Sequence, residues 1–457
     1  MKIPKSTRAC KTFRNVVFRH ENETLTSFAG LAMVHAWLRN LGLAESLRGI
    51  SKNKDASYPL HRIFLLLVVL RIMGFRRLRD AEPYRTDPLV LQTVGLKQMP
   101  DISTISRQFN GLFNESTLES IRKLNRSEVA AAAGKALFST WTLDFDGSVF
   151  RTRRKAENTA VGYNTQRKGE RSYYPLFCTL AQTAQVYDVL HRPGNVHDSN
   201  QAAEFMIDCI LSAPKDRSVE IRADAAFFSE SIIDTLDPLC TYTISMPFLR
   251  FPELKETIET RQHWKRMSKD ADYFELKWKP RCWRHKKVRL IAVRRVQPAR
   301  RKGPLQLDLF EPRDFEYTYS VVVTNGQGSA RRLVQGHAGR GTQEGLLGEL
   351  KNHLHADAVV FKTQHANAGS MWSSIFAHNL LRRIQIELGD PDRGPGCWKR
   401  PSLWIFKKAK TLRSVICRAG RILHPKNMTE MVIGGEKRDV EILAGLMPFD
   451  VGVTKTV

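Results

Sequence analysis

A succession of short apolar segments between residues 140 and 224 constrains the fold of this 457-residue chain more than any other feature. Most are rich in β-branched and aromatic residues, which is typical of strands, and one has the apolar spacing of a helix. In chain order we predict strands at Thr140–Asp146, Pro175–Ala181 and Ala184–His191, a helix at Ala202–Leu211 and a strand at Ser218–Ala223. This order predicts an α/β domain in which two strands lead into an acid, Asp146 or Asp224.

The layout resembles the α/β core of ribonuclease H-like proteins, which is built on a mixed sheet. Further strands are predicted at Cys240–Met246 and Tyr317–Thr324, and further helices at Gln343–Leu354 and Gly369–Leu388. We therefore expect residues 136–249 to form the first part of this core and residues 316–390 the remainder.

Residues 250–315 interrupt the pattern. This segment is rich in charge and contains Trp264, Trp278 and Trp283 among short β-like runs such as Val288–Val293. Its composition predicts a β-rich insertion placed late in the core.

Residues 1–135 are predicted to form a helical N-terminal domain that binds DNA. Apolar residues recur with a period near 3.6 after residue 26, and Ile63–Leu70 is a continuous apolar run. A helix is expected to start near Asp101, with Ser103 or Thr104 as its cap. A helix-turn-helix that presents Arg107 to DNA fits this pattern, and so does an ordinary helical bundle.

The charge balance points to a polyanionic partner. Lysine and arginine total 72 against 46 acidic residues, which gives a net charge of +26. Nucleic acid and an anionic membrane surface both fit such an excess. The apolar run at Ile63–Leu70 is far shorter than the roughly 20 residues of a spanning helix, so we expect a buried core helix and no membrane partner.

Residues 391–457 are expected to form a basic, helical C-terminal region. Between Lys399 and Lys426 there are nine lysines or arginines and no acid. The segment fits contact with DNA or with another subunit, and also a solvated basic helix.

The remaining composition excludes several classes of protein. The basic N-terminus lacks the apolar region of a secretory signal, so a cytoplasmic location is expected. Seven cysteines without a Cys-x-x-Cys pair argue against a disulfide framework or a structural zinc. His353 and His355 fit a surface position better than a metal site, because the sequence offers no further ligand nearby.

Acids at strand ends are the candidates for chemistry. Unpaired charges are rarely buried, so an acid that closes an apolar strand points to a ligand or to a cap of the following turn. Asp146 and Asp224 both fit this description. Asp144 lies on the same strand face as Asp146, which is preferred because it stands at the strand edge beside small residues.

A resemblance to a known family enters with the segment from His337 to Lys351. Arg340, Glu344 and Lys351 match the signature Tyr-x2-Arg-x3-Glu-x6-Lys of DDE-type bacterial insertion-sequence transposases, with His337 in place of the tyrosine. Further segments resemble the same family, and together the matches cover residues 143 to about 385. They are Leu143–Ser148, Gly162–Asn164, Lys168–Gly169, Arg171–Leu176, Arg192–Asn195 and Arg222–Asp224.

The resemblance implies a role for several residues. Asp146, Asp224 and Glu344 would form the catalytic, metal-binding triad for two Mg²⁺ ions, which Mn²⁺ can replace. Glu349, the other acid on the same helix, is expected on a solvated face.

DNA contacts are implied as well. Arg340 and Lys351 suit phosphates beside the cut, and His337 can donate the hydrogen bond of the missing tyrosine. Tyr163 and Asn164 either hold DNA or shape a loop. An aromatic of the insertion can stack on a flipped base, and Trp264, Trp278 and Trp283 are the candidates.

Three functions remain in competition. The first is a transposase that acts as a homodimer on double-stranded DNA, cuts the terminal inverted repeats and joins their 3′-hydroxyls to target DNA. The second is a site-specific nuclease on the same core. The third is a domesticated DNA-binding protein that has lost its chemistry, against which the presence of all three acids argues.

Overall fold

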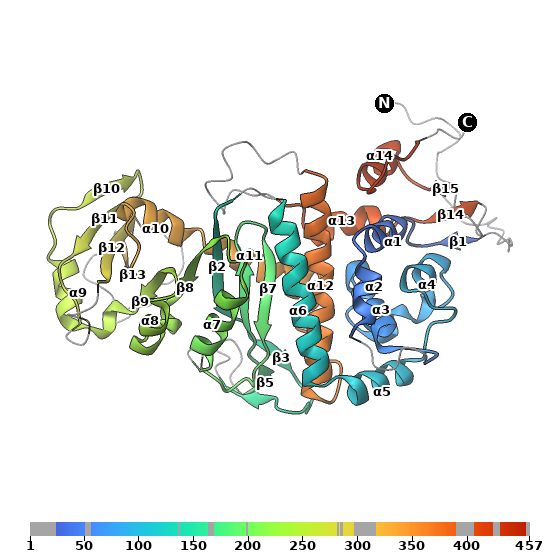
Figure 1. The fold of residues 1–457 in the computed structure, drawn as a ribbon, viewed down its shortest axis with the longest axis horizontal. Helices are drawn as coiled ribbons and strands as arrows, with labels where there is room; N and C mark the ends of the chain where they lie inside the picture. The colour runs from blue at the N-terminus through green and yellow to red at the C-terminus, as the bar shows by residue number, and fades with distance from the viewer. Residues whose placement is uncertain are drawn as a thin grey trace, which may run out of the picture.

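Among the residues that the computed structural model describes, a nine-stranded mixed sheet extends from the middle of the molecule to one side of it (Figure 1). The structure describes residues 24–50, 56–135, 138–162, 169–197, 200–280, 283, 287–296, 317–389, 406–423 and 430–453. Tyr163 and Asn164 lie outside the described residues.

Five strands make up the half of the sheet that carries the candidate acids. In spatial order they are β7 (Gln185–Leu190), β6 (Leu176–Leu180), β2 (Thr140–Gly147), β8 (Ser218–Ala223) and β9 (Thr241–Met246). β2, β8 and β9 are parallel, whereas β6 and β7 run antiparallel to their neighbours. Helix α7 (Ala202–Ser212) leads from β7 to β8, and α8 (Glu230–Leu236) leads from β8 to β9. The predicted mixed α/β class is confirmed.

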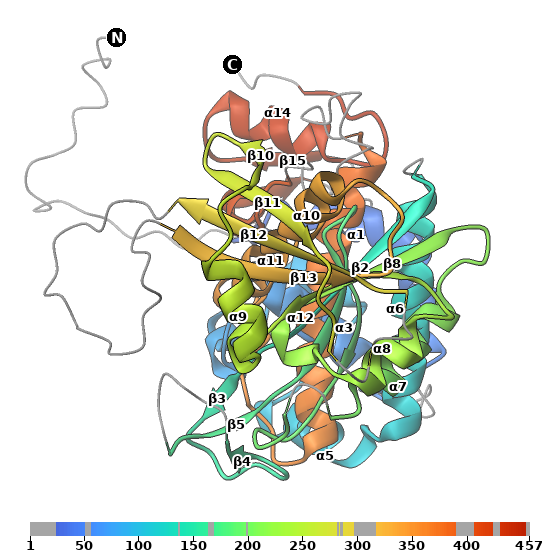
Figure 2. The ribbon, with the colours of Figure 1, turned by 90° about the vertical axis from the view of Figure 1, so that its left-hand side faces the viewer.

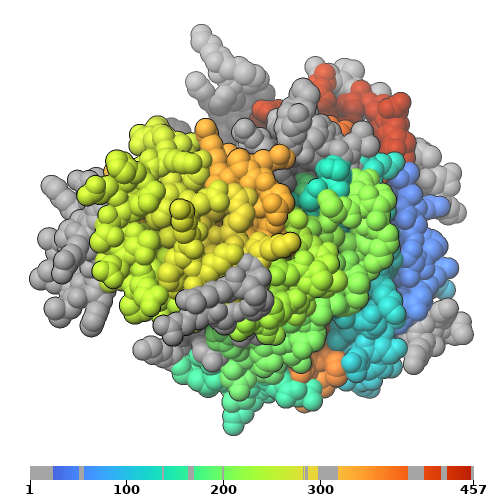
Figure 3. Space-filling model, turned by 60° about the vertical axis from the view of Figure 1, so that its left-hand side comes forward, coloured from blue at the N-terminus to red at the C-terminus, as the bar shows by residue number. Residues whose placement is uncertain are grey.

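The 250–315 segment extends this sheet. After helix α9 (Pro252–Glu259), strands β10 (Lys265–Ser268), β11 (Ala271–Leu276) and β12 (Arg289–Val296) pair in succession. β12 then pairs with β13 (Tyr317–Thr324), which pairs with β9. The predicted strands are therefore present. β12 pairs with the backbone N–H and C=O groups that β13 would otherwise leave unpaired at the edge of the sheet. Figure 2 shows these strands beside the rest of the sheet, and in the space-filling view of Figure 3 the yellow surface of this segment adjoins the green surface of the preceding residues.

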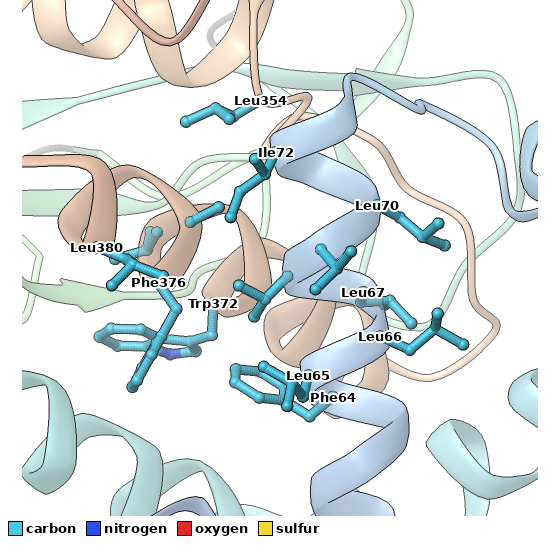
Figure 4. Packing of buried hydrophobic residues seen from close by; sticks show 14 of the residues in the cluster. Phe64, Leu65, Leu66, Leu67, Leu70, Ile72, Leu354, Trp372, Phe376 and Leu380 are labelled. Atoms are coloured by element: carbon cyan, nitrogen blue, oxygen red, sulfur yellow. The ribbon is translucent and has the colours of Figure 1, made fainter. Parts of the chain in front are cut away.

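The N-terminal helices share one apolar core with the C-terminal half of the chain. The helices are α1 (Leu31–Asn40), α2 (Leu43–Arg48), α3 (Leu60–Met73), α4 (Pro88–Val94), α5 (Ile102–Leu112) and α6 (Glu115–Gly134). Every residue of α3 except Arg62 is buried, as expected of a core helix. α3 packs on α12 (Gln364–Glu387), with Phe64 and Phe376 edge to face at 5.5 Å (Figure 4). Among the described residues, no helix combines the length and apolarity that a membrane span requires.

The start of α5 differs from the prediction. The helix begins at Ile102, so Ser103 and Thr104 lie inside its first turn and neither caps it. Asp101 holds the cap position and pairs with Arg85 at 2.8 Å. Arg107 is exposed on this helix, and its contact with DNA stays a prediction.

The C-terminal region contains the expected helices and, in addition, strands that were not predicted. It comprises α13 (Ala409–Ile416), β14 (Gly420–Leu423), β15 (Glu430–Ile433) and α14 (Lys437–Gly445). β14 pairs with β1 (Leu25–Thr26) and with β15 in a small antiparallel sheet. β1 and β14 are almost 400 residues apart in the sequence. No local sequence pattern predicts a pairing over that separation.

Candidate active site

Asp146 and Asp224 stand level with each other at the carboxyl edge of the sheet. β2 and β8 are parallel neighbours, and their last registered pair is Phe145 with Ala223. Asp146 is the next residue of β2, Asp224 directly follows the end of β8, and both side chains are partly exposed. Asp224 also accepts a hydrogen bond from the Ala226 N–H at 3.0 Å, which is the capping geometry considered as an alternative.

Asp144, two residues before Asp146, has a different environment. Its side chain is only 1% exposed, and its two carboxylate oxygens accept hydrogen bonds from Nε and Nη2 of Arg222, both at 2.6 Å. A carboxylate committed to an arginine in this bidentate way is a poor metal ligand. The pairing supports Asp146 over Asp144 as the candidate.

The junction of α10 (Ala330–Ala338) and α11 (Gly341–Asn352) lies against these strand ends. Arg340 occupies the N-cap position of α11, and its Nη1 is 3.6 Å from Oδ2 of Asp146. The same Nη1 is buried and has no hydrogen-bond partner in the described structure. Gln343 donates from Nε2 to the backbone carbonyl of Asp144 at 2.8 Å. The first turn of α11 is therefore fixed beside Asp146.

Glu344 lies on the same helical stripe as Arg340 and Lys351, four residues after one and seven before the other. Its side chain is exposed. Burial is the main cause that lowers the pKa of Lys351. The charge of Arg151 also lowers this pKa, whereas the charges of Asp357 and Asp146 raise it. Within the described residues, no three His, Cys, Asp or Glu side chains converge closely enough to hold a metal ion. Arg340 is a residue found beside Asp146.

The donor chemistry of the two aspartates fits a hard divalent cation. Both offer carboxylate oxygens at a partly exposed edge of the sheet, where Mg²⁺ can keep several waters. His337, near the junction that carries Arg340, has both ring nitrogens occupied by protein hydroxyls. The site therefore favours an oxygen-ligated ion over zinc.

Glu349 is buried, so the expectation of a solvated position is wrong. Its carboxylate pairs with Nη2 of Arg382 at 2.6 Å and accepts the Ala409 N–H at 2.7 Å. These contacts join α11 to α12 and to the start of α13. The sequence pattern missed them because both partners come from later segments of the chain.

His337 is half-buried, and its ring lies against strand β9. Nε2 lies 2.8 Å from the Ser245 hydroxyl and Nδ1 lies 3.1 Å from the Thr243 hydroxyl, both on β9. Burial lowers the pKa of His337 to about 3, and the charges of Arg340 and Arg222 act in the same direction. The ring is therefore neutral near pH 7, and a contact with DNA stays a prediction.

The three tryptophans of the 250–315 segment pack in different ways. Trp283 is 2% exposed and lies against Phe228 at 4.9 Å between ring centroids. Trp264 and Trp278 are partly exposed. The guanidinium of Arg294 covers the ring of Trp264, and Trp278 donates a hydrogen bond to Glu253. A stacking role is therefore easier to reconcile with Trp264 and Trp278 than with Trp283.

Two of the family-like motifs meet in a small sheet below the site. β3 (Phe150–Thr152), β5 (Arg171–Tyr173) and β4 (Ala160–Val161) pair in that order. Gly162 follows β4 and approaches Gly194 so closely that a Cβ on Gly162 would stand 2.0 Å from the Gly194 carbonyl oxygen. The glycines of these motifs therefore have a packing role.

Other sequence candidates do not form sites in the described residues. His355 lies against the carbonyl oxygen of Gly74 at 3.0 Å, and it belongs to no metal cluster there. The cysteines in the described residues, Cys178, Cys209, Cys240 and Cys417, are free thiols.

Comparison with known proteins identifies the family. The family model described as "Transposase DDE domain group 1" matches residues 9–390 of the chain. The chain belongs to this family of transposases. No curated protein gives a match.

Among solved structures, the chain is similar to the piggyBac transposase in its synaptic complex with hairpin DNA. The sequence identity is 10% and the TM-score is 0.42. The match covers 93% of this chain and 84% of that chain.

Proposed function

We propose that this chain is a metal-dependent DNA transposase that cuts at the ends of its element and joins the 3′-hydroxyls to target DNA. The observation that carries the proposal is the level position of Asp146 and Asp224 on adjacent parallel strands. The five strands of this half of the sheet follow one another in the chain as β2, β6, β7, β8 and β9, but they lie side by side in the order β7, β6, β2, β8, β9. The first strand of the chain therefore lies in the middle of the five. That order and the directions of the strands fit a ribonuclease H-like core.

In this proposal Asp146, Asp224 and Glu344 hold two Mg²⁺ ions. Bound there, the ions would activate the attacking water or 3′-hydroxyl and stabilise the leaving oxygen. Glu344 joins from the first turn of α11, which Gln343 fixes against β2. Arg340 exchanges its contact with Asp146 for a DNA phosphate, which offers its buried Nη1 the hydrogen bond it lacks.

The partners in this proposal are the terminal repeats and the target DNA, bound by a homodimer in the bacterial cytoplasm. The net charge of +26 favours such a partner through contacts with phosphates. Lys351, Arg107, Tyr163, Asn164, His337 and the partly exposed Trp264 and Trp278 remain proposed contacts. A nuclease on the same core is the alternative, and only the transposase forms joined products.

The test compares amide variants of the three acids with a matched control. Asp146→Asn, Asp224→Asn and Glu344→Gln keep shape and volume while they remove a charged ligand. Glu45→Gln is the control, because Glu45 is also an exposed glutamate in the first turn of a helix. Binding to labelled element ends is measured in Ca²⁺, and cutting and joining are measured in Mg²⁺ or Mn²⁺.

We expect all four variants to fold and bind ends, and the three acid variants to lose cutting and joining by about 10²–10³-fold, the scale expected for one group that stabilises the transition state. Glu45→Gln keeps parental activity. An active Glu344→Gln would remove that residue from the triad, and strong cleavage in excess chelator would refute metal dependence. Glu349→Gln is unsuitable as a control because Glu349 is a buried, paired residue.

A further inference from the structure

A buried ion pair lies one layer beneath the two candidate aspartates. Asp144 and Arg222 are registered partners on β2 and β8, each two residues before Asp146 or Asp224. Because side chains alternate along a strand, the pair and the two aspartates share one face of the sheet. The side chains of Asp144 and Arg222 are 1% and 2% exposed.

The same pair holds the junction that carries Arg340 and Glu344. Nη1 of Arg222 donates to the carbonyl oxygen of Gly336, in the last turn of α10, at 2.5 Å. The backbone carbonyl of Asp144 accepts from Nε2 of Gln343, in the first turn of α11, at 2.8 Å. Two hydrogen bonds thus fasten both sides of the α10–α11 junction to the strands.

Stability alone gives a weak reason for such a pair. Desolvating two charges costs about as much as their attraction returns, so well-packed apolar residues of similar volume usually serve at least as well. The bidentate pair instead fixes the relative positions of β2 and β8. The bond from Arg222 to Gly336 fixes the α10–α11 junction relative to these strands.

We propose that Asp144, Arg222 and Gln343 are positioning residues that hold the Arg340–Glu344 segment against Asp146 and Asp224. The inference rests on the proposed function, in which these acids bind the metal ions. Groups that orient metal ligands usually change metal affinity or activity by about 10–100-fold when they are removed.

The test replaces the pair by apolar residues in the double variant Asp144→Leu/Arg222→Met. It removes both charges of the pair together, and it removes the tether to Gly336. Gln343→Met removes the second tether alone. The matched control is Glu349→Leu/Arg382→Met, which replaces another buried pair that also anchors α11. Mn²⁺ binding is measured by electron paramagnetic resonance without DNA, beside the melting temperature and the Mg²⁺ dependence of cleavage.

We expect the Asp144→Leu/Arg222→Met and Gln343→Met variants to bind Mn²⁺ about 10–100-fold more weakly and to need correspondingly more Mg²⁺ for cleavage. The control variant keeps the parental Mn²⁺ affinity even where its melting temperature falls. If the double variant fails to fold, Gln343→Met and Arg222→Lys carry the test.

Parental Mn²⁺ affinity in folded Gln343→Met and Arg222→Lys overturns the proposal, and so does an equal loss in the control variant. Failure of the proposed metal site itself gives a different result. If the parent itself binds no Mn²⁺, or if Asp146→Asn leaves binding unchanged, the metal site is wrong and the positioning role falls with it.

Discussion

At the scale of single residues, burial determines the charge state of several histidines. Burial lowers the pKa of His337 and of His191 to about 3, and that of His378 to about 4. An unfolded histidine titrates near 6.5. Above pH 6.5 the imidazole is mostly neutral in both the folded and the unfolded chain. As the pH falls below 6.5, the unfolded chain binds a proton that the folded chain refuses, so stability declines until the folded pKa is reached.

This linkage predicts acid sensitivity in the window from pH 6.5 down to about 3. Each such histidine costs at most about 2 kcal/mol of unfolding free energy between pH 7 and pH 5, at about 1.4 kcal/mol per pH unit. His337→Gln, which keeps a hydrogen bond to one hydroxyl of β9, should show a shallower decline than the parent. Chemical unfolding at several pH values measures both slopes. The exposed His263→Gln should keep the parental slope, and a parental slope in His337→Gln would contradict the assignment.

The candidate site shows how far the sequence predicts the positions of the candidate residues, whose roles stay predictions. Strand-end position and alternation pointed to Asp146 and Asp224, and the parallel register brings these two together. Sequence spacing left Asp144 as a rival, because its arginine partner lies 78 residues away. Glu349 was misjudged for the same reason, since Arg382 and Ala409 come from other elements. Partners distant in sequence decide whether an acid is buried or available.

At the scale of elements, the glycines between the short strands permit close backbone contact. A Cβ on Gly194 would stand 2.3 Å from the Ser172 hydroxyl oxygen, 2.4 Å from the Ser172 carbonyl oxygen and 2.7 Å from the Ala160 carbonyl oxygen. Two of these atoms belong to the backbone of β5 and β4, which cannot move aside without loss of pairing. The Arg192–Asn195 motif therefore contributes a contact that only glycine permits.

Gly194→Ala should destabilise the protein by about 2 kcal/mol or more, the range expected for an overpacked site. Gly111→Ala is the matched control, because Gly111 lies in helix α5 and a Cβ there meets nothing within 4 Å. The control should be neutral or more stable by about 0.5 kcal/mol, since alanine favours the helix. Thermal melting of both variants gives the comparison. Equal melting temperatures would show that β4 and β5 yield to the methyl group.

Most individual elements follow from local patterns, whereas their partners do not. The strand Ser218–Ala223 has the predicted bounds, because alternation is a local property. That β10, β11 and β12 continue the central sheet depends on pairing with β13, which no local pattern encodes. The pairing of β1 with β14 was missed for the same reason.

At the scale of the whole molecule, the C-terminal region completes the core of the N-terminal helices. Leu412 and Ile416 of α13 are buried in the same apolar cluster as α1 and α3. Arg413 donates from Nε to the carbonyl oxygen of Ile72, near the end of α3, at 2.9 Å. Trp37 of α1 donates to the carbonyl oxygen of Leu446 at 2.6 Å. The family match ends at residue 390, but the packing does not.

A chain truncated after Gly389 should therefore fail to fold stably, although it keeps almost all of the family-matched region. It loses the buried side chains Leu412, Ile416 and Ile422, each worth about 1.5–3 kcal/mol of apolar burial. It also loses the β1–β14 pairing. The sum is a large part of the roughly 5–15 kcal/mol that stabilises a typical protein. Removal of residues 448–457 alone is the control, because Phe449 and Val451 are exposed and the Leu446 carbonyl is kept. Solubility and cooperative melting distinguish the two truncations. If a chain of residues 1–389 melts cooperatively at the parental temperature, the C-terminal region does not contribute to the stability of the core.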